Sequence, residues 1–294
     1  YDSAGISGLN NEAVTLSDTT LAVSVLNTLD GHTSGTIDAG TVTTLTGSAS
    51  DLITAYASGG ISNLGDEAVS VSSGNASTSQ ANTLAAATSG VVTATLSDGD
   101  LSTLAGLTET GNAYSITITD TSVDAAALNT LDGKTTVAID ASAITTLTGA
   151  AADLNTAYAA NGSSITGLGN EAATLSDTTL AVSVLNTLDG HTSGTVNANT
   201  VTTLTGAAAD LNTAYDSAGI SNLGNEAVTL SDTTLAVSVL NTLDGNTSGT
   251  VNANTVSTLT GAAADLNTAY DSAGISGLNN EAVTLSDTTL AVSV

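Results

Sequence analysis

The residues best suited to chemistry in this sequence are aspartates that recur at fixed positions. One set shares the motif Leu-Ser-Asp-Thr-Thr and comprises Asp18, Asp177, Asp232 and Asp287, of which the last three are evenly spaced. Calcium takes several oxygen ligands from carboxylates and carbonyls. Stacked acidic corners could supply such ligands, so these four aspartates are the candidate calcium ligands. Plain solvation of an acidic surface is the alternative interpretation.

Two more aspartate sets recur in the same way. They comprise Asp30, Asp132, Asp189 and Asp244 in one set, and Asp51, Asp153, Asp210 and Asp265 in the other. If equivalent corners recur on every second coil of a stack, they lie about 9.6 Å apart, which is too far for one ion to bridge. The glycine-rich calcium nonapeptide and the twelve-residue calcium loop are both absent from the sequence. Calcium binding is therefore a hypothesis, and no cofactor is required.

The histidines give no support to catalysis. His32 and His191 occupy the same place in the repeated Leu-Asp-Gly-x-Thr turn, where other repeats have Lys134 or Asn246. A position that accepts all three residue types is typical of a solvated corner. Serine, histidine and aspartate occur without an arrangement that singles out one nucleophile and one base. We therefore expect that the protein is not an enzyme.

Composition and charge exclude several other classes. The formal net charge is −27, with one Lys or Arg against 28 acidic residues. Nucleic acids and anionic membrane surfaces need basic residues, so neither is an expected partner. No apolar run is long enough to span a membrane. Apolar residues make up 41% of the chain, yet it has no Pro, Cys, Met, Trp or Phe, which favours a narrow aliphatic interior.

Internal repetition organises the whole chain. Residues 1–25 and 270–294 are identical, and the string beginning at Leu16 recurs at Leu175 and Leu230. Because the chain opens and stops on repeats, we expect a window on a longer array. The repeats form one continuous array with units of approximately 1–55, 56–104, 105–157, 158–214, 215–269 and a partial 270–294.

Each repeat contains two related halves of about 27 residues that must stack to bury their apolar faces. Alternating residues at Val228 and Leu230, and at Val251 and Ala253, predict strands that lie one above another. The alanine-rich segment 261–270 predicts a short helix, whereas the segment "AVSVLNTLDG" fits either a helix or a strand. We therefore predict a mainly β fold, a β-solenoid with one such half per coil and possible short helices on one side. A string of small β-sandwich domains is the alternative.

The repeat resembles that of very large surface proteins from marine cyanobacteria. The resemblance is carried by "AGISNLGNEAVTLSDTT" at 218–234, "LNTLDGHTSGTV" at 185–196 and "TVTTLTGAAADLN" at 200–212. It implies an exported structural protein at the cell surface or outside the cell, without catalytic residues.

Two functions follow from the sequence. The first is an extracellular structural protein, a filament subunit or a stalk segment of a giant cell-surface protein, which associates with identical chains end to end or laterally. The second is an adhesin that binds a glycan or a surface through threonine- and aspartate-rich faces, with calcium as its candidate cofactor. Threonine-rich segments such as 41–46 would also suit ice binding, although threonine is common in ordinary strands.

Overall fold

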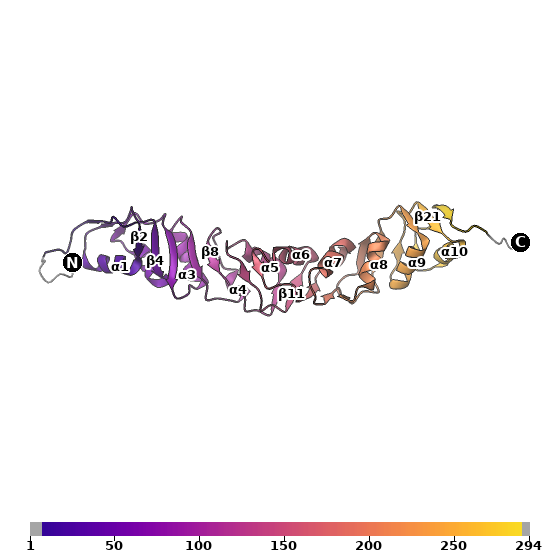
Figure 1. The fold of residues 1–294 in the computed structure, drawn as a ribbon, viewed down its shortest axis with the longest axis horizontal. Coiled ribbons are helices and arrows are strands. Elements are labelled where there is room, and N and C mark those ends of the chain that lie inside the picture. The colour runs from indigo at the N-terminus through magenta and orange to yellow at the C-terminus, as the bar shows by residue number, and fades with distance from the viewer. Residues whose placement is uncertain (1–7, 290–294) are drawn as a thin grey trace. The chain divides into compact units, whose positions relative to one another are not determined.

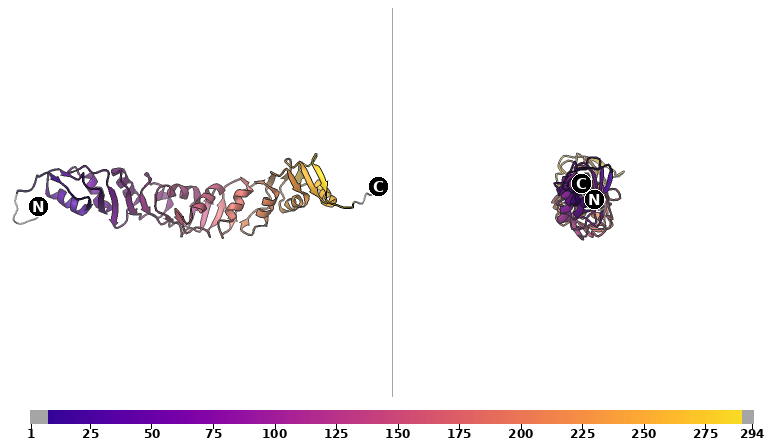
Figure 2. Two further views of the ribbon diagram at one scale, coloured as in Figure 1. Left: turned by 45° about the horizontal axis from the view of Figure 1, so that its top comes forward. Right: turned by 90° about the vertical axis from the view of Figure 1, so that its left-hand side faces the viewer.

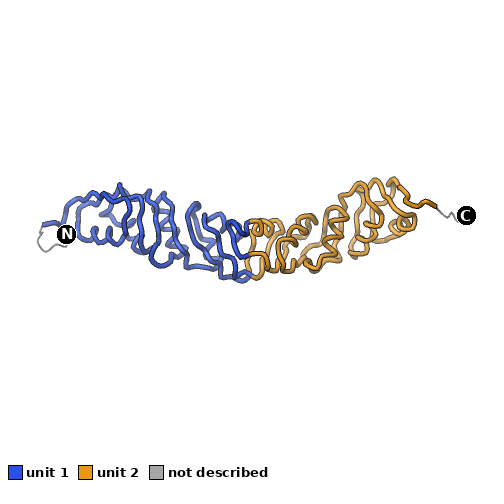
Figure 3. Tube along the Cα trace, in the orientation of Figure 1, with its two compact units in different colours: residues 1–121, 127–144, 160–167 blue, residues 122–126, 145–159, 168–294 orange. Residues whose placement is uncertain are grey.

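The computed structural model describes residues 8–289 and divides the chain into two compact units. Unit 1 comprises residues 1–121, 127–144 and 160–167, and unit 2 comprises residues 122–126, 145–159 and 168–294 (Figure 3). Both units are built by the same alternation of short helices and short parallel strands (Figures 1 and 2).

Ten helices lie within residues 8–289. They are α1 (Val23–His32), α2 (Ala49–Ala57), α3 (Thr78–Ala87), α4 (Leu101–Leu104), α5 (Ala125–Asp132), α6 (Ala151–Ala160), α7 (Val182–Asp189), α8 (Ala208–Asp216), α9 (Val237–Asn246) and α10 (Ala263–Asp271). Spacing explains them: α9 buries Val237, Leu240 and Leu243, which recur at every third position and so share one face of a helix. None of the helices in this range is both long and apolar enough to cross a membrane.

These helices overturn the predicted mainly β solenoid. Helix covers 31% of the chain and strand 28%, so the fold is mixed α/β, with parallel sheets alternating with helices. The helix predicted for 261–270 is present as α10, but the ambiguous segment "AVSVLNTLDG" is also helical, as α7 and α9 show. The β-branched residues of that segment suggested strands. The helical spacing of its buried Val and Leu residues decides the structure instead.

Within residues 8–289, three parallel sheets lie in each unit. Those of unit 1, in spatial order, are β1 (Val14–Thr15), β3 (Ile37–Asp38) and β5 (Ile61–Ser62); β2 (Thr20–Ala22), β4 (Thr44–Ser48), β6 (Ala68–Ser73), β7 (Val92–Thr95) and β8 (Ala113–Ser115); and β10 (Ile139–Asp140) and β12 (Ile165–Thr166). Those of unit 2 are β9 (Ser122–Asp124), β11 (Thr146–Gly149), β13 (Ala172–Leu175), β15 (Val196–Asn197) and β17 (Ile220–Ser221); β14 (Thr179–Ala181), β16 (Thr203–Gly206), β18 (Ala227–Leu230), β20 (Val251–Asn252) and β22 (Ile275–Ser276); and β19 (Thr234–Ala236), β21 (Thr258–Gly261) and β23 (Ala282–Leu285).

The strand register shows how successive coils stack within unit 2. Leu204 pairs with Val228, and Val228 pairs with Val251, so the predicted stacking of Val228 on Val251 is confirmed. One full repeat is the interval from Asp177 to Asp232. The number of residues between paired strand positions, from Leu204 to Val228 or from Val228 to Val251, is less than half of that interval. Strands from different places in the repeat therefore pair within one sheet, and each sheet is limited in length. A new sheet begins one repeat later, as shown by β14 and β19, which each begin a sheet.

Polar ties of several kinds join neighbouring coils, and two of them involve the backbone of helices and strands. An asparagine in the Leu-Asn-Thr motif of one helix donates to a carbonyl of the next, as Asn186 Nδ2 does to Asp210 O at 3.0 Å and Asn241 Nδ2 to Asp265 O at 2.9 Å. Parallel strands supply the second tie through backbone hydrogen bonds. The interior between helices and strands is formed mainly of Val, Leu, Ile and Ala, and Tyr114 is the largest fully buried side chain among the described residues.

Candidate functional site

Three of the four calcium candidates bind the start of a helix in the preceding coil. The Oδ2 atoms of Asp177, Asp232 and Asp287 accept hydrogen bonds from the backbone amides of Ala151, Ala208 and Ala263, at 2.8, 2.8 and 2.7 Å. These amides open α6, α8 and α10, where the helix has no internal acceptor for them. Each aspartate therefore acts as a helix cap supplied by another coil.

The caps compensate for alanine at the helix starts. The N-cap residues of α8 and α10 are Ala207 and Ala262, which make no side-chain cap bond. In α2 the N-cap is Ser48, whose side chain accepts from the amide of Asp51. In the coil that follows α2, the position equivalent to Asp232 is occupied by Ser73, which has no carboxylate. An aspartate from the next coil thus caps α8 and α10, which lack a local side-chain cap. In α3 the two caps occur together, because Ser77 caps the helix locally and Asp98 accepts from the amide of Thr78.

The structure does not gather the candidates around one point. The backbone carbonyl of Asp18 accepts from Thr41 Oγ1 at 3.3 Å, a role different from that of the other three. Residues 8–289 contain no group of three or more His, Cys, Asp or Glu side chains arranged to hold a metal ion. Calcium binding stays a prediction.

The second aspartate set is also engaged between coils. Its members accept a serine hydroxyl from the following coil, as Asp30 does from Ser58 and Asp189 from Ser217, both at 2.7 Å. The third set lies in the first helical turn, where a carboxylate interacts favourably with the helix dipole, as with Asp210 in α8. The recurring acidic positions therefore have structural roles within the coils.

Buried glutamates form the sites that sequence reasoning missed. Tyr56 Oη donates to Glu67 Oε2 at 2.9 Å, and Tyr215 Oη donates to Glu226 Oε2 at 3.1 Å, with both glutamates fully buried. Burial, reinforced by the neighbouring glutamate, raises the pKa of Tyr56 and Tyr215 well above the ordinary tyrosine value. The identical separation of Tyr from Glu along the chain in both repeats was the available signal.

Glu226 also forms hydrogen bonds with the loop that precedes it and with the next coil. The amides of Gly224 and Asn225 donate to Glu226 Oε2 at 2.8 and 3.1 Å. The backbone carbonyl of Glu226 accepts from Thr247 Oγ1 of the next coil at 2.8 Å. The same threonine–carbonyl bond joins Thr33 to Glu12, Thr88 to Glu67 and Thr192 to Glu171. The glutamate is thus a hub that fixes one loop and ties two coils.

The hub around Glu171 differs in its aromatic neighbour. His191 is exposed and stacks on Tyr158, with ring centroids 5.9 Å apart and an angle of 12° between the rings. The Tyr158 hydroxyl is buried without a hydrogen bond, and burial raises its pKa to about 12. His32 lies at the end of α1. His191 follows α7 and is exposed, as predicted for a solvated corner, whereas His32 is the half-buried last residue of a helix.

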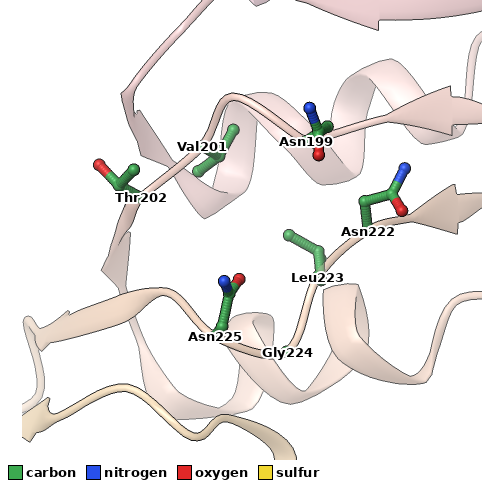
Figure 4. A pocket seen from close by; sticks show the side chains of 7 residues that line it. All are labelled: Asn199, Val201, Thr202, Asn222, Leu223, Gly224 and Asn225. Atoms are coloured by element: carbon green, nitrogen blue, oxygen red, sulfur yellow. The ribbon is translucent and has the colours of Figure 1, made fainter.

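A groove opens between two loops of consecutive coils beside the Glu226 hub. It encloses about 430 Å³ and is lined by residues 199, 201, 202 and 222–225. Leu223 and Asn225 point from one loop toward the loop that carries Asn199 (Figure 4). An equivalent groove in unit 1, lined by Gly40 and residues 63–66, also encloses about 430 Å³.

No protein-family model, curated protein or solved structure matches the chain.

Proposed function

We propose that the chain is an extracellular structural protein, a filament subunit or a stalk segment of a giant cell-surface protein, without catalysis. The observation that supports this most is the recurrence of one set of coil-to-coil bonds. Both units repeat the threonine–glutamate carbonyl bond and the asparagine bond between helices. When every coil makes the same contacts with its neighbours, further coils can be added without changing the stability per coil.

The energetics of the coil boundaries suit a structural role under tension. A hydrogen bond of this kind contributes about 1 kcal/mol net, and each coil boundary carries several in addition to strand pairing and apolar burial. Because each coil contacts mainly its neighbours, the boundaries are similar to one another and none has to carry the whole stability. A tensile load along the stack passes in full through every boundary, and boundaries of similar strength leave no single weak point.

Identical chains are the partners that we propose, associating end to end or laterally. Coils of similar sequence recur along the chain, so a coil of one copy offers the same backbone groups and apolar residues as a coil of another copy. The net charge of −27 opposes association at low salt. Salt reduces this repulsion, since the screening length is about 8 Å at physiological ionic strength. The same charge disfavours nucleic acid as a partner.

Single-molecule pulling of the full chain tests the structural role. We expect the chain to unfold in several steps whose contour-length gains are multiples of about 9 nm, because one coil of about 27 residues extends to that length. A single cooperative step that releases the whole chain at once would contradict a stack of similar boundaries.

Sedimentation of the same protein at increasing salt tests self-association separately. We expect the average mass to rise as salt screens the charge. A mass that stays at one chain at every salt and protein concentration would refute association while leaving the pulling result intact.

A further inference from the structure

We propose that the groove between loops 199–202 and 222–225 binds an uncharged carbohydrate chain. Asn199 stands on one side of the groove, and Leu223 and Asn225 reach toward it from the other side (Figure 4). Asn199 and Asn225 are exposed, whereas Leu223 is half-buried. The groove thus offers amide groups above an aliphatic surface.

The chemistry of the lining selects the ligand. A carboxamide carries both donors and an acceptor, and a sugar hydroxyl likewise donates and accepts, so the two groups can bond in either sense. Leu223 gives an apolar surface for the C–H face of a sugar ring. The lining residues of this groove have no ionisable side chain, although the chain carries a net charge of −27. Neither a cation nor an anion finds a complementary charge there.

The groove is held in shape before any ligand binds. Asn222 has a left-handed backbone with φ of 64°, and its Nδ2 donates to Asn197 Oδ1 of the preceding coil at 2.8 Å. Further along the same loop, the backbone amides of Gly224 and Asn225 are fixed by the buried Glu226 carboxylate. A preformed site loses less conformational entropy on binding. The glutamate hub therefore has a second consequence, a rigid wall for the groove.

The equivalent groove of unit 1 provides a natural contrast. Gly40 stands where unit 2 has Asn199, and Asp66 stands where it has Asn225. Asn63 keeps the left-handed backbone with φ of 61° and donates to Asp38 Oδ1 at 2.8 Å. The backbone is thus retained, while both side-chain amides are lost and a carboxylate takes the place of one of them. We expect carbohydrate to prefer the unit 2 groove.

The test titrates the labelled full chain with neutral hexasaccharides of glucose, galactose and mannose, followed by NMR of the Asn222–Asn225 amides. We expect at least one of them to shift these signals with a dissociation constant in the range of about 1–10 mM. The Asn199→Gly/Asn225→Asp variant copies the unit 1 groove, so it should fold, as circular dichroism would verify, and bind at least about 5-fold more weakly, a loss of about 1 kcal/mol. The reciprocal Gly40→Asn/Asp66→Asn variant should gain shifts at 63–66.

The inference is overturned by any of three results. The first is that no neutral hexasaccharide shifts the loop signals at about 10 mM, the weak end of single-site affinity. The second is an equal response to a hexagalacturonate or to a neutral hexapeptide. The third is binding that the Asn199→Gly/Asn225→Asp variant leaves unchanged. None of these results bears on the pulling experiment, because the structural role does not depend on the groove.

Discussion

The helix pair α2/α3 in unit 1 and the pair α8/α9 in unit 2 share the buried Tyr–Glu bond but differ in the contact beside it. In α8/α9, Asn246 Nδ2 donates to Asn212 Oδ1 at 3.0 Å. In α2/α3 the equivalent residues are Ile53 and Ala87, and they line an apolar cavity of about 210 Å³ together with Tyr56. Apolar residues thus replace the hydrogen-bonded asparagine pair in unit 1, and the two helices still pack in the same way. The difference teaches that the glutamate hub sets the backbone, whereas the neighbouring helix contact is adjustable.

Removing the hub should have the largest effect. Glu226→Ala leaves Tyr215 Oη and the amides of Gly224 and Asn225 without their acceptor inside the protein, so we expect a loss of about 3 kcal/mol in the free energy of unfolding. Glu67→Ala should cost a similar amount, because its hub is also buried. Denaturant unfolding measures both.

Glu281 supplies the matched control for that substitution. It accepts from Tyr270 Oη at 3.3 Å and from the amide of Asn279 at 2.8 Å, but it is only half-buried, whereas Glu226 is fully buried. Glu281→Ala should therefore cost less than about 1 kcal/mol. Equal losses at Glu226 and Glu281 would show that burial of the hub is unimportant.

The buried tyrosines predict alkaline destabilisation. Burial raises the pKa of Tyr158 and Tyr114 to about 12, and raises that of Tyr56 and Tyr215 further. The folded protein then holds more protons than the unfolded chain above about pH 10, so its stability is complete below that pH and falls as pH rises through about 12. Tyrosinate absorbance against pH checks this, and an ordinary titration near pH 10 in the folded state would contradict it.

A smaller effect is expected at the helix caps. Asp232→Ala removes the acceptor of the Ala208 amide and should cost about 1 kcal/mol. Ala207→Ser in the same variant should recover part of that loss, because it copies the local cap that Ser48 gives to α2. Thermal unfolding of the single and double variants measures the recovery. No recovery would mean that Asp232 stabilises the protein by some route other than capping.

The asparagine tie should give the smallest effect. Asn246→Ala breaks the bond to Asn212, and we expect a loss of less than about 1 kcal/mol, with a coupling between the two positions of about 0.5 kcal/mol in a double-mutant cycle. The matching pair in unit 1, Ile53→Ala and Ala87→Asn, should show no favourable coupling. A similar coupling in both units would remove the distinction between the two helix pairs.

Local patterns predicted part of this fold. Alternation at Val228 and Leu230 predicted β18, and the alanine-rich segment predicted α10, because in both cases neighbours in sequence carry the signal. The mainly β class was wrong because the segment "AVSVLNTLDG", which fits either a helix or a strand, is helical in α7 and α9, where its buried residues follow helical spacing. Here burial between coils outweighed local propensity.

The site was less predictable. Asp232 was recognised as a recurring acidic residue, but its partner, the amide of Ala208, belongs to the preceding coil. The groove depends on Asn199 and Asn225, which meet only because consecutive coils place their loops side by side. The strand register determines which two loops lie side by side. The sequence repeat does not reveal this register, because each strand-to-strand step is shorter than half a repeat.

Deletion of one whole repeat tests the central claim, that stability comes from neighbouring coils, most directly. Removing residues 215–269 joins Ala214 to Tyr270 and preserves the repeat register across the junction. Under this account the shortened protein folds with unchanged helix content per residue, and its denaturant m-value falls by about one fifth, in proportion to the surface lost. A shortened protein that is unfolded or aggregated, while the full chain is folded, would contradict the stack and indicate a single indivisible core.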